Sequence, residues 1–105
     1  MGEAPLNLRA MVYADGEEWV AHCLDLDLVE TGPSPDAAMS ALAEAVGTQV
    51  GYAREHDNFA HLFHPAPREA WRRFGEILRG AHRTTLVRVL DDCGQEFAIQ
   101  SLLTA

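Results

Sequence analysis

The chain has 105 residues, of which 48% are hydrophobic and 23% are charged, and its formal net charge at pH 7 is −8. Its length fits one domain with one core, and its acidity argues against general nucleic-acid binding, because phosphate groups would be repelled. No apolar run approaches the roughly 20 residues that cross a bilayer, and the first residues lack a secretory signal, so we expect no membrane association and a cytoplasmic protein.

Three short strands are predicted at the front of the chain. Apolar and polar residues alternate over residues 6–13, which is the period of a half-buried strand. An Asp-Gly turn then leads into a second strand over about 18–24, in a register that would place Val12 opposite Trp19. A third strand over about 28–31 completes an antiparallel meander, with the apolar positions of the first two strands on one face.

A long helix is predicted next, ending near Glu55. Ser34 can cap its first turn, and the following proline suits the first helical position. Apolar residues then recur at steps of three and four, at Met39, Leu42, Val46, Val50 and Ala53. Gly47 and Gly51 lie four residues apart on one side of this helix, where the absence of side chains permits close approach to another backbone.

The rear of the chain is predicted to hold one helix and one hairpin. Residues 56–65 show no clear period and are expected to form an ordered connector. A second helix should begin near Pro67 and end at Gly80, followed by strands over about 84–90 and 96–101. The predicted class is therefore α+β, in one domain over 1–105: an antiparallel three-stranded meander covered by a helix, then a second helix and a C-terminal hairpin.

The front half resembles the HicB-like antitoxins of bacterial toxin-antitoxin systems. The resemblance rests on residues 13–26, with their Asp-Gly turn and following tryptophan, and on residues 31–38, with a Thr-Gly loop before an alanine-rich helix. It covers about half of the chain. It implies a partial RNase H-like fold that masks a small basic, mRNA-cleaving toxin, here a HicA-like partner.

The rear half departs from this family. Many members carry a C-terminal helix-turn-helix or ribbon-helix-helix that binds operator DNA, whereas residues 66–105 continue into the predicted helix and hairpin. No recognition helix is recognisable in them. Direct DNA binding is therefore not expected.

Charge is divided unevenly along the chain. Residues 1–65 hold eleven acids and two arginines, a net of −9, whereas residues 66–105 hold six arginines and five acids, a net of +1. An acidic half favours basic partners. The acids predicted to bind the toxin are Asp15, Glu17, Glu18, Asp25, Asp27 and Glu30.

Neither catalysis nor a cofactor is predicted. A nuclease of the RNase H type needs a metal-binding carboxylate on its first strand, and residues 6–13 contain no acid. Asp25 and Asp27 fit a solvated acidic edge better than a metal site. His61 and His64 have a spacing at which two imidazoles can share Zn²⁺, but no third ligand follows, so we expect surface or partly packed histidines.

Arginines cluster on the second helix and just after it, at Arg68, Arg72, Arg73, Arg79 and Arg83. The favoured interpretation is a polar helix face paired with Glu69 and Glu76 or with a sister subunit. The alternative is a ligand- or RNA-binding surface on a stand-alone oligomeric domain of the same fold.

A homo-oligomer is predicted through residues 67–103. The final hairpin has apolar residues on both faces of its strands, and the second helix can cover only one face. Uncovered apolar surface of this kind commonly meets a second copy of the chain. The predicted interface residues are Trp71, Phe74, Leu86 and Phe97.

Overall fold

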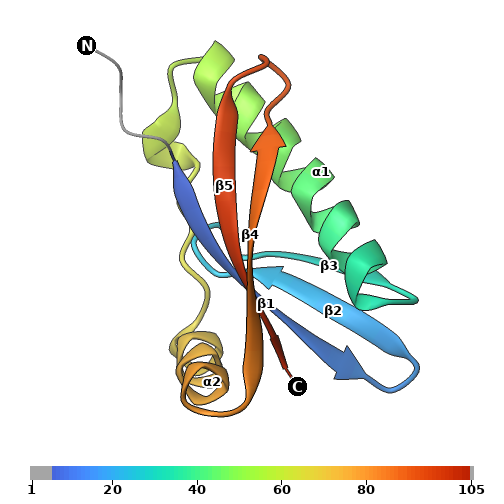
Figure 1. The fold of residues 1–105 in the computed structure, drawn as a ribbon. Helices are drawn as coiled ribbons and strands as arrows, with labels where there is room; N and C mark the ends of the chain where they lie inside the picture. Colours follow the sequence, from blue (N-terminus) through green and yellow to red (C-terminus); the bar gives the residue numbers. More distant parts are fainter. Residues whose placement is uncertain (1–5, 105) are drawn as a thin grey trace.

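The computed structural model describes residues 6–104 and has an α+β fold with one five-stranded sheet and two α-helices (Figure 1). The elements in chain order are β1 (Asn7–Asp15), β2 (Glu18–Cys23), β3 (Leu28–Gly32), α1 (Pro35–Glu55), the 3-10 turn η1 (Phe59–His61), α2 (Arg68–Arg79), β4 (His82–Leu90) and β5 (Glu96–Thr104). The predicted α+β class is confirmed. No described helix is both long and apolar enough to cross a membrane.

The strands form one mixed sheet in the order β3-β2-β1-β5-β4. Neighbours β1 and β2, β2 and β3, and β4 and β5 pair antiparallel, whereas β1 and β5 pair in parallel. The predicted three-stranded meander and final hairpin are both present, but they belong to one five-stranded sheet, because β5 lies alongside β1. Parallel pairing between strands this far apart in the chain leaves no local pattern in the sequence.

The register of the first hairpin differs from the predicted one by two residues. Val12 lies opposite Ala21, and Trp19 lies opposite Ala14. The turn sits one position later than expected, with Gly16 at a φ of +64°, a conformation that glycine adopts without steric cost. Because the shift is two residues and side chains alternate between faces, every side chain keeps its predicted face.

Helix α1 covers one face of the sheet. Its N-terminus is capped as predicted, since the Ser34 hydroxyl accepts a hydrogen bond from the Ala37 amide at 3.1 Å. The apolar stripe of α1 packs on inward-facing residues of β1, β2 and β5. The fully buried members of this core include Leu8, Ala10, Cys23, Leu42, Val46, Val50, Phe97 and Ile99.

Helix α2 packs on the opposite face of the sheet. It contributes Ile77, with half-buried Trp71 and Phe74, to a second and smaller core that contains Met11 and Leu102. Met11 alternates with the β1 residues that face α1, which places the two cores on opposite faces of the sheet. Figure 1 shows α2 beside the end of the sheet where β4 begins.

Candidate functional site

Three acidic side chains gather at the turn between β1 and β2. Asp15 ends β1, Glu17 lies in the turn and Glu18 begins β2, and all three are exposed. Among residues 6–104, no ion pair includes any of them. We call these three residues the acidic turn. No ion pair within the described residues compensates its negative charge.

Asp25 lies at the other end of β2 and is already engaged. Its Oδ1 accepts a hydrogen bond from the Arg9 amide at 2.7 Å, and its Oδ2 forms an ion pair with Arg9 Nη2 at 3.0 Å. Arg9 in turn stacks over Trp71, with the guanidinium carbon 4.8 Å from the ring centroid. Much of the charge of Asp25 is therefore balanced within the chain.

Asp27 is also engaged, by a histidine. Its Oδ1 lies 2.7 Å from Nε2 of His22, a side chain on β2 that is only 8% exposed. Asp27 has a φ of 53°, a left-handed conformation that aspartate tolerates better than most residues. The contact holds this carboxylate against the sheet.

The six predicted acids consequently do not form one patch. Asp25 and Asp27 follow the end of β2, roughly 17 Å from its start, and the half-buried Glu30 lies on β3 opposite Ala21, a residue of the α1 face. Of the six predicted acids, only the three of the acidic turn lie together. Asp36, which was not predicted, is exposed at the N-terminus of α1 and lies at the same end of the sheet, because Gly32 pairs with Trp19.

A groove of about 760 Å³ runs between α2 and the sheet. Its lining residues are Met11, Tyr13, His22, Asp27, Pro67, Glu69, Ala70, Arg72, Arg73 and Glu76. The Arg73 guanidinium carbon lies 3.7 Å from the centroid of the Tyr13 ring. Within the part of the chain that the structure describes, no ion pair joins Glu69 or Glu76 to an arginine, so the predicted pairing along this helix is absent. The groove carries charges of both signs.

The predicted interface residues fall in different environments. Leu86 is 55% exposed on β4, whereas Phe97 is 1% exposed beneath α1. The prediction for Phe97 is wrong, because the alternation of β5 turns this side chain into the core. Trp71 and Phe74 lie on α2, half-buried against the second core, with ring centroids 6.3 Å apart in an edge-to-face arrangement.

The two closely spaced histidines lie at the surface. His61 ends η1 and His64 follows it, and both are exposed. Across residues 6–104, no group of three or more metal-ligand side chains is close enough together to hold a metal ion. The histidines therefore have no third ligand from the described chain.

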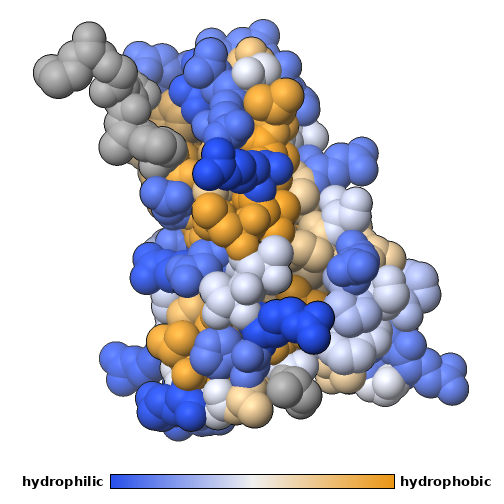
Figure 2. Space-filling model, viewed as in Figure 1, coloured by the Kyte–Doolittle hydropathy of each residue, from blue (hydrophilic) through white to orange (hydrophobic). Residues whose placement is uncertain are grey.

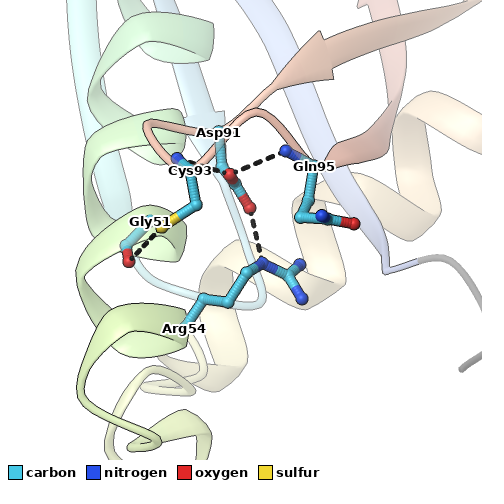
Figure 3. A network of polar contacts seen from close by, with 5 residues as sticks. All are labelled: Gly51, Arg54, Asp91, Cys93 and Gln95. Atoms are coloured by element: carbon cyan, nitrogen blue, oxygen red, sulfur yellow. Dashed lines mark hydrogen bonds and ion pairs between the residues drawn. The ribbon is translucent and has the colours of Figure 1, made fainter.

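A charged cluster is buried where the turn between β4 and β5 meets α1 (Figure 3). The fully buried Asp91 side chain accepts from Arg54 Nε at 2.8 Å, and from the amides of Cys93 and Gln95 at 2.8 and 3.1 Å. Burial acts to raise the pKa of Asp91, but these hydrogen bonds outweigh it and hold the pKa below its ordinary value of 3.8. All three donors belong to the chain itself, so this cluster is structural.

No protein-family model, curated protein or solved structure matches the chain.

Proposed function

We propose that this chain is a non-enzymatic, HicB-like antitoxin-type protein that binds and neutralises a small basic mRNA-cleaving toxin. The observation that carries the proposal is the acidic turn, whose three exposed carboxylates have no ion-pair partner among the described residues. The resemblance of residues 13–26 and 31–38 to HicB-like antitoxins supports the choice of partner. The proposed contact surface is the acidic turn together with Asp36.

Electrostatic attraction explains how such a surface would work. Exposed carboxylates attract a cationic protein before contact and orient its approach. This attraction extends over a Debye length, about 8 Å at physiological ionic strength. Asp25 and Asp27, which are bonded to Arg9 and His22, should contribute less.

Neutralising the acidic turn should weaken binding of the toxin. In the triple variant Asp15→Asn, Glu17→Gln, Glu18→Gln we expect an affinity lower by roughly tenfold, because each exposed charge contributes up to about 1 kcal/mol. The partner to test is the basic product of a short reading frame adjacent to that of this chain, purified and titrated calorimetrically. In bacteria whose growth is arrested by the toxin, co-expression of the unaltered chain should restore growth, and co-expression of the variant should restore it less.

A charge-matched control comes from the exposed acids on and just after α1. The triple variant Glu44→Gln, Glu55→Gln, Asp57→Asn removes the same net charge, and none of these side chains forms an ion pair within residues 6–104. It should bind with nearly unaltered affinity. Equal losses in both triple variants would show that net charge matters and the acidic turn does not, and no loss in either would contradict the proposal.

The groove along α2 supports a second candidate, a ligand- or RNA-binding role. Arg72 and Arg73 line it, and Arg73 lies over the Tyr13 ring. Guanidinium groups of this kind can contact phosphate and stack on a base. We expect Arg72→Gln, Arg73→Gln to reduce binding of short single-stranded RNA about tenfold, measured by fluorescence anisotropy. The control Arg79→Gln, Arg83→Gln, outside the groove, should have little effect. Failure of the unaltered chain to bind this RNA would remove the RNA form of this candidate.

A further inference from the structure

The β4 edge of the sheet is long and unpaired. Strand β4 spans nine residues and pairs only with β5, so its other side has no strand partner within residues 6–104. Such an edge exposes a row of backbone donors and acceptors, and soluble proteins usually cover or pair it. The opposite edge, β3, is only five residues long.

Apolar side chains are exposed along the same strand. Leu86 and Leu90 are 55% and 64% exposed on one face of β4. On the other face, half-buried Val87 and Val89 line a groove of about 530 Å³ between β4 and α1. Figure 2 shows hydrophobic surface gathered over β4 and β5. Water therefore contacts apolar groups on both faces of a free strand edge.

We infer that β4 pairs antiparallel with β4 of a second copy, which forms a closed dimer with a continuous ten-stranded sheet. With the two-fold axis at Leu86, all nine residues of β4 are paired. It places Leu86 opposite its own copy, Arg88 opposite Thr84 and Val89 opposite Arg83, with Val87 opposite Thr85. Opposed residues share a face of the sheet, as antiparallel pairing requires.

The charges on β4 favour a second copy of β4 over other strands as the partner of this edge. Strand β4 carries Arg83 and Arg88 and no acid. Arg88 forms an exposed ion pair with Glu96 of its own chain at 3.6 Å, so Arg83 is the main like charge that would oppose a basic segment, such as the proposed toxin would offer. In the register centred on Leu86, both arginines lie opposite uncharged residues. A β3 strand carries Glu30 but spans only five residues. Contacts between β3 of one copy and β4 of the next would be head-to-tail and would build a ring or a filament.

The first test introduces charge at the axis. Because Leu86→Arg would place two arginines directly opposite each other, we expect the variant to be monomeric at micromolar concentration by analytical ultracentrifugation, and the unaltered full chain to be dimeric. The control is Leu78→Arg on α2, since Leu78 is 51% exposed and off the strand. It should remain dimeric. Circular dichroism should report the same fold for both variants.

The second test checks the proposed register at Thr84, which would lie opposite Arg88 of the second copy. Thr84→Glu should tighten the dimer roughly 2- to 25-fold, because two opposite-charge cross-strand pairs form, and Thr84→Arg should weaken it by a similar factor. The matching control is Thr31, an exposed threonine on the other edge strand. Its Glu and Arg variants should leave the dissociation constant unaltered.

Three results would overturn the inference. The unaltered chain could be a monomer at micromolar concentration, or it could form assemblies larger than a dimer, as β3–β4 pairing would produce. The dimer could also persist in Leu86→Arg while the two Thr84 variants have equal affinity. Binding of the basic partner is measured separately, so it can succeed or fail independently of dimerisation.

Discussion

Replacing Gly51 with alanine should destabilise the protein by about 2 kcal/mol, with a melting temperature lower by on the order of 10 °C. A Cβ at this position would lie 2.7 Å from Asp92 Cβ and 2.8 Å from the Asp92 amide nitrogen. The Asp92 amide also donates to the Gly47 carbonyl of α1 at 3.3 Å. The added methyl group must therefore push the β4–β5 turn away from α1.

The other glycine to test lies inside α2. A Cβ on Gly75 would meet only Arg79 Nη1 at 3.4 Å, the far end of a flexible side chain. Because alanine favours a helix interior over glycine by about 1 kcal/mol, Gly75→Ala should stabilise the protein. Thermal and urea unfolding should show a lower free energy of unfolding for Gly51→Ala and a higher one for Gly75→Ala than for the unaltered chain. A stabilised Gly51→Ala variant would contradict the close contact between turn and helix.

Replacing Asp91 with alanine should destabilise the protein by about 3 kcal/mol. The substitution removes the acceptor of two backbone amides and leaves Arg54, whose side chain is 27% exposed, without its ion-pair partner. The control is Asp92→Ala, since Asp92 is exposed and its side chain has no hydrogen bond among the described residues. That variant should change the free energy of unfolding by about 0.5 kcal/mol or less.

The contribution of Asp91 should also depend on pH. Its pKa in the folded chain is below the ordinary value of 3.8, so the unfolded chain binds a proton at this residue more readily than the folded chain does. The stabilisation is complete above that ordinary value and is lost as the pH falls through the folded pKa. The difference in unfolding free energy between the unaltered chain and Asp91→Asn should thus be constant from neutral pH to about pH 5 and shrink below 3.8. A difference that shrinks above pH 5 would contradict this.

Local features of the fold could be predicted from the sequence, and long-range pairing could not. The Ser34 cap, the apolar stripe of α1 and the close approach at Gly47 and Gly51 each follow from a few neighbouring residues, and the structure confirms them. The parallel pairing of β1 with β5 depends on side chains of both strands packing together under α1. Their alternation predicts two strands but not that they are neighbours.

The same holds for the candidate site, where the sequence predicts local clustering but not contacts between distant residues. The clustering of Asp15, Glu17 and Glu18 is visible in the sequence, because they lie in one turn. The neutralisation of Asp25 by Arg9 is not visible, because these residues meet only when β1 and β2 are paired. For the same reason Asp36 was missed, since it reaches that end of the sheet through the pairing of Gly32 with Trp19.

The most direct test of the proposed function is the association rate of the basic partner as a function of ionic strength. For the unaltered chain, the rate constant should fall as salt rises, because screening shortens the reach of the acidic turn. For the triple variant Asp15→Asn, Glu17→Gln, Glu18→Gln it should start lower and depend much less on salt. The same salt dependence in both proteins, or a rate indifferent to salt in the unaltered chain, would contradict binding through the acidic turn.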